Sequence, residues 1–495
     1  MARIAAHITY LAVLVWLSVL VLGADISSVS KGLVVVGLIG IWRYSWAAVN
    51  FTRAAIYLNY VFPRLRARAE KAYGALPAPA HAYFLVTSFK IEPDVTTRVY
   101  RSIFRAAAAS RGGATIVVSV VDLADETLIR KIWDLMPRDV DLSRVHLHLD
   151  RIPGTGKRDA LARSYRLISR MSPTRHDVVV VADGDTCVPV DIVETSAPFF
   201  TDPRVGALTT DEIAETPEPG LFRDWYNLRF SQRQMMMSSQ GLSGRVLTLT
   251  GRMSVFRADL LTDPGFIAQV ESDSIEHWRL GTVKFLTGDD KSTWFWLLSN
   301  GYLMRYLPDV ASVSMESQPK PGFMDSAITL MVRWFGNMLR TNGRALALST
   351  STIGYYTKWA LLDQRLGIWT TIAGPLSVIW GTLFIDVMVL PAYVAWVLFT
   401  RYVFCWILSL VREPGFPITY PFLLWFSQIF GATVKSYILF RLDRQRWTRQ
   451  PGGSAGKAAR PPLGQRVRAY SSTFVHSLAL GWLALATLFL SGVLR

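Results

Sequence analysis

Two carboxylates separated by one glycine form the clearest chemical pattern in this 495-residue chain. Asp183, Gly184 and Asp185 follow an apolar run at 178–182, which is typical of a buried β-strand. The glycine lets the chain turn, so both acids can face one site beyond the strand. Hard oxygen ligands of this kind suit Mg²⁺ or Mn²⁺, with a diphosphate completing the metal's coordination shell. An ordinary strand-to-loop turn, in which Asp and Gly are common, is the alternative explanation.

A second acidic pair, Asp289 and Asp290, lies downstream and directly precedes a helix-like stretch at 292–298. Carboxylates at a helix start are stabilised by the helix dipole, so simple capping would account for the pair. The chemical alternative is general-base catalysis, in which one of the acids takes a proton from a substrate hydroxyl.

A glycine-rich turn at 154–159 leads into a helix and carries two cations, Lys157 and Arg158. It is not a Walker loop, because the spacing is wrong and no Ser or Thr follows the lysine. A positive helix start can still face a diphosphate. The alternative is that these cations are solvent-exposed surface residues without a role in binding.

The segments between these motifs alternate between short β-branched runs and longer amphipathic stretches, which predicts βαβ units and a parallel sheet with buried strands. Ligands of such sheets bind beyond the carboxyl ends of the strands. The predicted strands are Tyr83–Thr87, Ala114–Val121, Val145–Leu149 and Val178–Ala182, and the predicted helices between them include Val95–Ala109 and Lys157–Ser169.

Apolar segments gather at both ends of the chain. Residues 4–23 and 33–49 are each long enough to cross a hydrocarbon core about 30 Å thick. We interpret them as a retained helical hairpin rather than a cleaved signal peptide, because the charged start is weak and a second span follows at once. Four further apolar segments follow the α/β region, at 366–390, 391–411, 421–440 and 474–494.

The net charge of +16 does not indicate a nucleic-acid-binding protein, because the cations flank the apolar segments. Basic residues follow the second segment and fill residues 441–468, as the positive-inside rule requires of cytosolic regions. The two cysteines, Cys187 and Cys405, offer neither a disulfide framework nor metal-ligand spacing, which agrees with a reducing cytosolic location for the middle region.

The segment at 421–440 is the weakest span, because Lys435 and Ser436 interrupt it. We expect an interfacial or re-entrant helix there, which keeps the basic loop at 441–472 cytosolic. Apolar residues at three- and four-residue intervals in 323–345 predict an amphipathic helix, either packed in a core or lying in the membrane surface.

Taken together, the motifs resemble the processive family 2 glycosyltransferases, which include the synthases of cellulose, chitin, hyaluronan and alginate. The resemblance covers nearly the whole chain and implies an α/β nucleotide-sugar domain of GT-A type inserted between α-helical transmembrane segments. Residues 202–207 and 251–257 are also similar to recurring segments of the family. The expected parts are an N-terminal transmembrane hairpin (1–52), a cytosolic GT-A domain (75–322), an amphipathic interface helix (323–345), transmembrane and interfacial helices (366–440), a basic cytosolic loop (441–472) and a C-terminal transmembrane helix (473–495).

The resemblance also implies roles for single residues. Asp290 and Asp289 would be the catalytic residues, with Asp290 as the general base, and Asp183 and Asp185 would bind the metal. Donor nucleotide contacts would come from Asp122, Lys157, Asp183 and Arg333. Asp122 departs from the family pattern, because its usual acidic partner is replaced and the next acid is Asp125.

The family's Gln-x-x-Arg-Trp motif is only partly present. Arg333 and Trp334 fit it, but the glutamine position holds Leu330. By resemblance Arg333 neutralises the leaving diphosphate and Trp334 stacks on the acceptor sugar. A later segment resembles the gating loop of related synthases and consists of Trp447, Thr448 and Arg449.

Within the family, the chain is most similar to the mannuronan synthases, the catalytic subunits of bacterial alginate polymerases. The stretches at 286–291 and 333–343 carry this similarity. It implies GDP-mannuronate as donor, Mg²⁺ (or Mn²⁺) as cofactor, a β-1,4-linked polyuronate as product, and the bacterial inner membrane as location. The implied partners are a cyclic-di-GMP-binding PilZ companion subunit and periplasmic export proteins.

Two other functions stay open at this point. A related synthase could make another polysaccharide, such as hyaluronan, chitin or cellulose, from a UDP-sugar. A passive polysaccharide transporter with a degenerate domain is the non-enzymatic alternative, and the presence of both acidic pairs argues against it.

Overall fold

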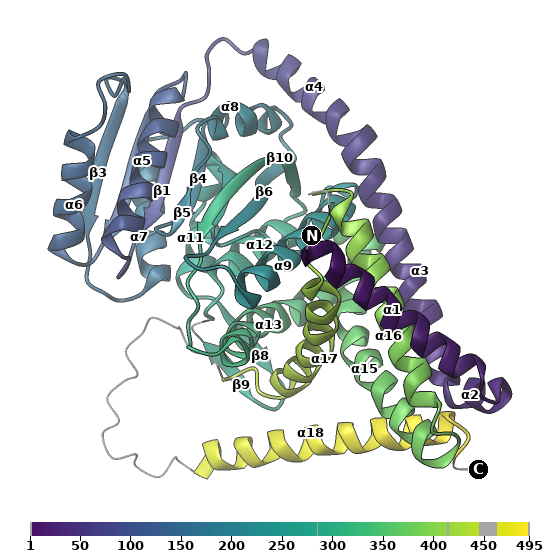
Figure 1. Cartoon of the computed structure of the whole chain (residues 1–495). Coiled ribbons are helices and arrows are strands. Elements are labelled where there is room, and N and C mark those ends of the chain that lie inside the picture. Colours follow the sequence, from purple (N-terminus) through teal and green to yellow (C-terminus); the bar gives the residue numbers. More distant parts are fainter. Residues whose placement is uncertain (1, 285, 413–414, 445–462, 494–495) are drawn as a thin grey trace.

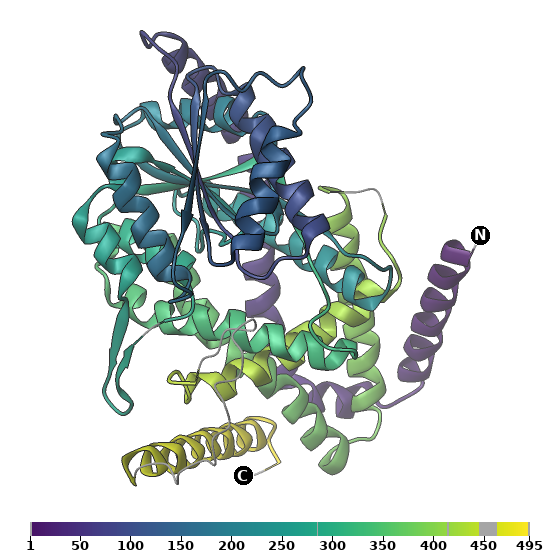
Figure 2. The same cartoon turned by 90° about the vertical axis from the view of Figure 1, so that its left-hand side faces the viewer.

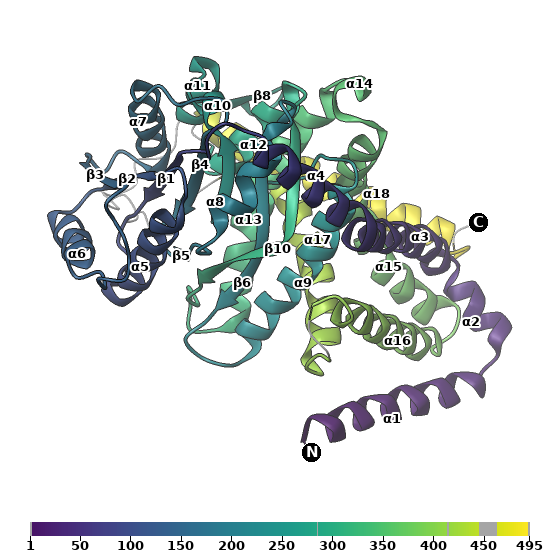
Figure 3. The ribbon, with the colours of Figure 1, turned by 90° about the horizontal axis from the view of Figure 1, so that it is seen from above.

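The computed structural model describes residues 2–284, 286–412, 415–444 and 463–493. An α/β domain forms one part of the molecule, and apolar helices from both ends of the chain lie together beside it (Figure 1). Two further views show the same division from the side and from above (Figures 2 and 3).

The α/β domain is built on an eight-stranded sheet with the order β3-β2-β1-β4-β7-β6-β10-β5. Its first four strands are parallel, whereas β7 runs antiparallel to both of its neighbours. β10 is parallel to β6, and β5 pairs antiparallel with β10. The strands are β1 (Ala82–Thr87), β2 (Ala114–Val120), β3 (Val145–Arg151), β4 (Val178–Asp183), β5 (Thr186–Cys187), β6 (Val205–Glu215), β7 (Met253–Arg257) and β10 (Leu303–Met315), with a separate hairpin of β8 (Ser274–His277) and β9 (Gly281–Lys284).

Strands β1 and β2 read as continuous apolar runs because both faces of the sheet are covered there. Helix α7 packs on one face of the parallel half, and α5 and α6 pack on the other (Figure 3). All four strands and both helices predicted from the sequence are confirmed, with small shifts at their ends. The helices of the domain are α5 (Pro93–Ala109), α6 (Leu123–Asp134), α7 (Lys157–Arg170), α8 (Ile192–Ser196), η2 (Ala197–Thr201), α9 (Leu221–Gly241), α10 (Ala258–Leu261), α11 (Pro264–Glu271) and α12 (Asp289–Ser299).

Six helical stretches in the described part of the chain are long and apolar enough to cross a membrane. They include the stretch 419–439, for which an interfacial position stays a prediction. The second stretch, 34–74, is continuous through a π-helical turn and runs along the domain (Figure 1). The helices outside the domain are α1 (Ala2–Leu22), α2 (Ile26–Gly32), α3 (Val34–Ile56), η1 (Tyr57–Val61), α4 (Phe62–Gly74), α13 (Phe323–Ala347), α14 (Thr350–Ile353), α15 (Tyr355–Phe384), α16 (Val389–Ser409), α17 (Thr419–Leu439) and α18 (Leu463–Leu490).

Helix α13 connects the two parts of the molecule. It packs against α12 of the α/β domain on one side and against α15 and α17 on the other. Ala327, Met331 and Leu339 are fully buried, and the polar residue Arg340 is only 4% exposed. The predicted amphipathic helix is therefore present and lies between the domain and the apolar helices, whereas its position in a membrane surface stays a prediction.

Candidate active site

The parallel strands end at one edge of the sheet, and the first acidic motif lies there. Asp183 is the last residue of β4, and its backbone N–H donates to the Arg252 carbonyl oxygen at 2.8 Å. Asp122 follows β2 at the same edge, where it is exposed at the start of α6. Both residues therefore lie where ligands of a parallel sheet bind.

Gly184 is required by the packing at this edge. Its N–H donates to the Thr87 carbonyl oxygen at 3.0 Å, which draws the turn against the end of β1. A Cβ atom at this position would lie 2.6 Å from the Ser88 hydroxyl oxygen and 3.0 Å from its Cα. Only glycine therefore lets Asp183 and Asp185 leave the strand as closely as they do.

Lys157 brings the two acidic motifs together. It is the first residue of α7, after Gly156, whose φ of 124° favours glycine. The Lys157 ammonium lies 2.7 Å from Asp183 Oδ1 and 3.0 Å from Asp289 Oδ2. Burial opposes its charge, but the two carboxylates outweigh burial and raise the Lys157 pKa. The glycine-rich turn is thus part of the site and not surface decoration.

The carboxylates of Asp183, Asp185 and Asp289 lie close enough to repel one another. Burial raises the pKa of Asp183, and although Lys157 opposes this, the neighbouring Asp185 and Asp289 raise it further. A cation placed among these carboxylates would relieve the repulsion.

Arg158 fixes the turn that carries the second acidic pair. Its guanidinium is buried and donates to the carbonyl oxygens of Leu286 and Gly288, to Val270 O at 2.6 Å, and to Ser292 Oγ at 2.9 Å. One side chain therefore satisfies carbonyls on both sides of the turn. Because Lys157 and Arg158 are consecutive, the start of α7 sets the distance between the two acidic motifs.

Asp290 differs from Asp289 in its surroundings. It is half-buried, and no cation of the described residues forms an ion pair with its carboxylate. Burial raises the Asp290 pKa, with a further contribution from Asp289 against the opposing charge of Lys291. Burial also lowers the Lys291 pKa to about 8. An accessible carboxylate with a raised pKa suits a general base.

Helix α13 supports the other side of the acidic turn. Asn337 accepts from the Thr287 hydroxyl at 2.7 Å, and its side chain lies 3.0 Å from where a Cβ on Gly288 would be. Arg340 donates to Asn337 Oδ1 at 2.8 Å and to the Leu442 carbonyl oxygen at 2.9 Å. The turn before Asp289 is thereby connected to the end of α17.

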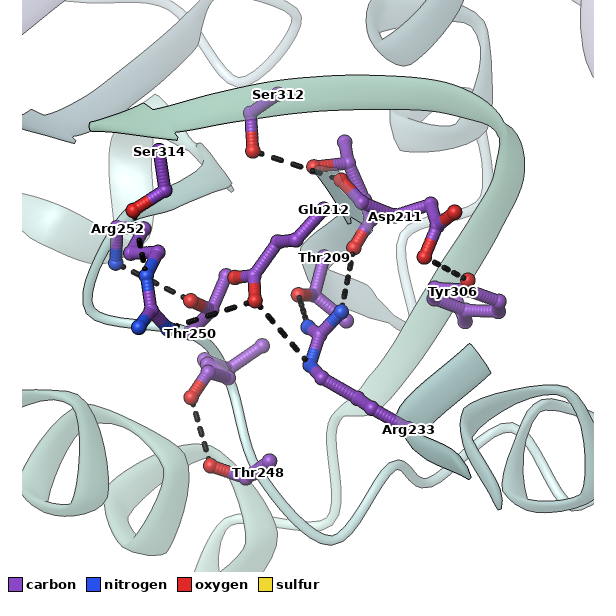
Figure 4. A network of polar contacts seen from close by, with 12 residues as sticks. Thr209, Asp211, Glu212, Arg233, Thr248, Thr250, Arg252, Tyr306, Ser312 and Ser314 are labelled. Atoms are coloured by element: carbon purple, nitrogen blue, oxygen red, sulfur yellow. Dashed lines mark hydrogen bonds and ion pairs between the residues drawn. The ribbon is translucent and has the colours of Figure 1, made fainter. Parts of the chain in front are cut away.

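A polar network surrounds the buried residue Glu212 (Figure 4). Arg252 approaches Glu212 at 3.5 Å and Glu316 at 2.6 Å, and Arg233 on α9 lies 3.7 Å from the same Glu212 carboxylate. The preceding residue, Gly251, would place a Cβ 3.8 Å from that of Asp290. The segment at 251–252 therefore contacts both acidic motifs, since the Arg252 carbonyl also holds Asp183.

Trp334 lies in an aromatic and cationic cluster on the side of α13 that faces α9. Its ring stacks on Trp225, with centroids 5.7 Å apart, and the Arg229 guanidinium lies 4.2 Å above its centroid. Arg333 is half-buried beside it. Trp225 and Arg229 were not singled out from the sequence, because their spacing of four residues on a mostly buried helix resembles ordinary core packing.

The donor set fits a divalent cation that a diphosphate also binds. In the described part of the chain no group of three or more His, Cys, Asp or Glu side chains could hold a metal alone. Proteins usually contribute one or two carboxylates to Mg²⁺ when substrate phosphates complete its coordination shell, and Asp183 and Asp185 can supply them. The predicted gating loop, Trp447 to Arg449, lies outside the described residues.

An α/β domain whose parallel strands end at two linked acidic motifs, set among apolar helices, defines a membrane-associated glycosyltransferase of GT-A type. The chain belongs to glycosyltransferase family 2, since the pattern described as "Glycosyltransferase like family 2" matches residues 79–337, more than half of its length. The family and fold class expected from the sequence are therefore confirmed.

The relatives place the chain more narrowly, among the Alg8 glycosyltransferases. It is 44% identical over 449 residues to the glycosyltransferase Alg8 of Pseudomonas syringae pv. tomato, covering 90% of each chain. It is 43% identical over 420 residues to that of Azotobacter vinelandii, covering 84% of each chain.

Solved structures resemble the fold more distantly. The mannosyltransferase PcManGT from Pyrobaculum calidifontis, in complex with GDP-Man and Mn²⁺, has 19% identity and a TM-score of 0.43, covering 78% of this chain and 97% of its own. Staphylococcus aureus TarS has 12% identity and a TM-score of 0.31, covering 60% and 49%.

Proposed function

We propose that the protein polymerises mannuronate from GDP-mannuronate into β-1,4-linked polymannuronate and passes the product across the bacterial inner membrane. The observation that carries this is the ion pairing of Lys157 with both Asp183 and Asp289, in a chain related to Alg8 over nine-tenths of its length. Asp290, next to Asp289, forms no ion pair with the described residues. The GT-A domain would be cytosolic, because the donor is made there and basic residues flank the apolar helices.

The donor would bind where the parallel strands end. Asp122 would contact its nucleoside, and Asp183 and Asp185 would hold Mg²⁺ or Mn²⁺ on the diphosphate. The bound metal supplies charge neutralisation for the leaving diphosphate. Lys157, already placed between Asp183 and Asp289, would stabilise the same oxygens together with Arg333.

Asp290 would act as the general base. It would take the proton from the acceptor hydroxyl, which attacks the anomeric carbon opposite the departing nucleoside diphosphate and so inverts it. The raised pKa makes this carboxylate a stronger base than an exposed aspartate. Asp289, paired with Lys157, would serve the donor side, and Trp334 would stack on the acceptor sugar.

The apolar helices would form the path for the growing chain, so that synthesis and export are coupled. The PilZ companion subunit and the periplasmic export proteins expected from the resemblance belong to this proposal. The gating-loop role expected of Trp447, Thr448 and Arg449 from the resemblance also belongs to this proposal.

The decisive experiment supplies membranes containing the protein with labelled GDP-mannuronate, GDP-mannose, UDP-glucose, UDP-glucuronate or UDP-N-acetylglucosamine. We expect polymer from GDP-mannuronate alone, and digestion of that polymer by a mannuronate lyase. Membranes carrying Asp290→Asn serve as the control for other synthases. Polymer from a UDP-sugar, with none from GDP-mannuronate, would contradict the proposal.

A further inference from the structure

Arg229 is a half-buried cation whose partners are aromatic rings. Its guanidinium lies 4.2 Å from the ring centre of Trp334 and 5.0 Å from that of Trp225. Among the described residues, no carboxylate forms an ion pair with Arg229, and no acceptor forms a hydrogen bond with it. Burial lowers its pKa to about 10. The side chain nevertheless keeps part of its surface open, because it is only half-buried.

Lys435 repeats this arrangement inside α17, one of the six helices that are long and apolar enough to cross a membrane. Its ammonium lies 4.4 Å from the ring centre of Phe335, with no ion pair or hydrogen bond among the described residues. A lysine near a span end usually extends toward the lipid headgroups. Lys435 instead points inward at α13, and Gly431 permits this closeness, because a Cβ there would lie 3.4 Å from Phe335.

The two cations face neighbouring rings of α13. Trp334 and Phe335, the rings that they face, are consecutive on α13, and α9, α13 and α17 pack against one another. The charged groups that act on Lys435 are Arg229, Arg43 and Asp363, of which the last two neutralise each other in a 2.6 Å ion pair. Glu316 and Arg252, which both act on Arg229, are likewise paired with each other at 2.6 Å. Arg229 and Lys435 are therefore left without an ion-pair partner among the described residues.

A ring face offsets only part of the cost of taking a cation out of water. A cation within a membrane segment, such as Lys435 in α17, usually marks the route of an ion or substrate. An anion that moves past both groups would supply the missing partners, and it would not have to compete with a fixed carboxylate. Aromatic rings beside the cations would contact the apolar faces of sugar rings.

We propose that Arg229 and Lys435, with Trp334 and Phe335, form a binding strip for the carboxylates of an anionic β-1,4-linked sugar polymer leaving the active site. The inference rests on the proposed function and deepens it, because it assigns recognition of the product's charge to two residues outside the acidic motifs. Arg229 faces Trp334, to which the proposed function assigns the acceptor sugar, and Lys435 in α17 faces the next ring, Phe335.

The test measures binding of a defined oligomannuronate to the full-length protein in lipid nanodiscs, with a neutral β-1,4-linked glucose oligomer of equal length as comparison. We expect Arg229→Gln and Lys435→Gln each to weaken oligomannuronate binding at least about tenfold and to flatten its salt dependence. Binding of GDP with Mg²⁺ stays unchanged in both variants, which also reports that they are folded. Products made by the variants should be shorter.

Arg401→Gln is the matched control, because Arg401 also lies in a membrane-type helix, α16, but donates to the Tyr44 hydroxyl at 3.2 Å. It should bind the oligomer as the unmodified protein does. Equal binding of the neutral oligomer, or unchanged binding in Arg229→Gln and Lys435→Gln, would overturn the inference. Binding that depends on the two cations without GDP release from GDP-mannuronate would instead refute the proposed function alone.

Discussion

The two acidic motifs are held in place in different ways. Asp183 ends a buried strand, and main-chain hydrogen bonds to β1 and to residue 252 fix its turn. The turn before Asp290 belongs to no strand and is held by side chains of other elements, Arg158 from α7 and Asn337 from α13. The donor half of the site is thus determined by the sheet, whereas the acceptor half depends on long-range packing.

Because of this difference, a movement of the surrounding helices would affect the positions of Asp183 and Asp290 to different extents. Movement of α13 relative to the domain would act on Asp290 directly through Asn337, but on Asp183 only indirectly, through Lys157 and the 251–252 segment. Because Arg340 joins α13 to the chain after α17, the acceptor half is also tied to the membrane region. Substitutions that affect only one half should therefore have separable kinetic effects.

The largest effect is expected from Asp290→Asn, which removes the proposed base. Polymerisation should fall by about 10³-fold, within the range for general bases, while donor binding stays nearly intact. Asp289→Asn should instead weaken donor binding, because it removes one of the two partners of Lys157. Initial rates and GDP-mannuronate titrations of both variants measure this, and equal effects on binding and turnover in both would contradict the division.

Arg158→Met should produce the next largest effect, a loss of about 10²-fold in turnover. It removes the hydrogen bonds to the carbonyls of Leu286 and Val270, at a cost of about 1–3 kcal/mol for each buried group, whereas the Gly288 carbonyl keeps its bonds from Ser292. The control is Arg166→Met on the same helix, which breaks an exposed pair with Glu271 worth at most about 1 kcal/mol. Similar thermal stability and turnover in the two variants would show that Arg158 does not fix the turn.

Asn337→Ala should lower turnover by about tenfold with little change in donor affinity, because it frees the acidic turn from α13. Asn342, five residues later on the same helix, is the matched control. It also pairs with an arginine, Arg365 at 2.6 Å, but it faces α15 instead of the site. Asn342→Ala should reduce thermal stability and leave turnover per folded molecule unchanged. A raised KM for the donor in Asn337→Ala would place this residue on the other half of the site.

The smallest expected effect is on the pH dependence of binding of GDP with Mg²⁺. The raised pKa of Asp183 means that the carboxyl binds a proton at higher pH than an ordinary aspartate, and a bound metal must displace it. Affinity for GDP with Mg²⁺ should therefore fall a few-fold as the pH is lowered from about 8 to 5.5, with proton release on binding. Calorimetry in buffers of different ionisation enthalpy measures the release. Its absence, or its persistence in Asp183→Asn, would contradict this assignment.

The donor half was largely predictable from the sequence, because strand and turn signals are local. The apolar run ending in Asp183-Gly184-Asp185 could be recognised without knowing the fold. The pairing of Lys157 with Asp289 could not, because it depends on how α7 and α12 pack. Arg158 stood out only as a second cation in a glycine-rich turn, and nothing local shows that it turns inward.

The aromatic and cationic cluster was missed for a similar reason. Trp225 and Arg229 fall on a helix that is buried on several sides, so no periodic stripe marks them. The one sequence signal was Lys435, a cation interrupting an otherwise apolar segment. It was interpreted as weakness of the span, whereas the structure shows it directed at a ring of α13.

The bonds of Arg158 have a consequence for sequence change. Three of its four acceptors are main-chain oxygens, at residues 270, 286 and 288, which every amino acid possesses. Side chains at 270 and 286 can therefore be exchanged for others of similar volume without altering where the acidic turn lies. An engineer can therefore exchange these two buried neighbours for apolar side chains of similar size, provided that Arg158 is kept.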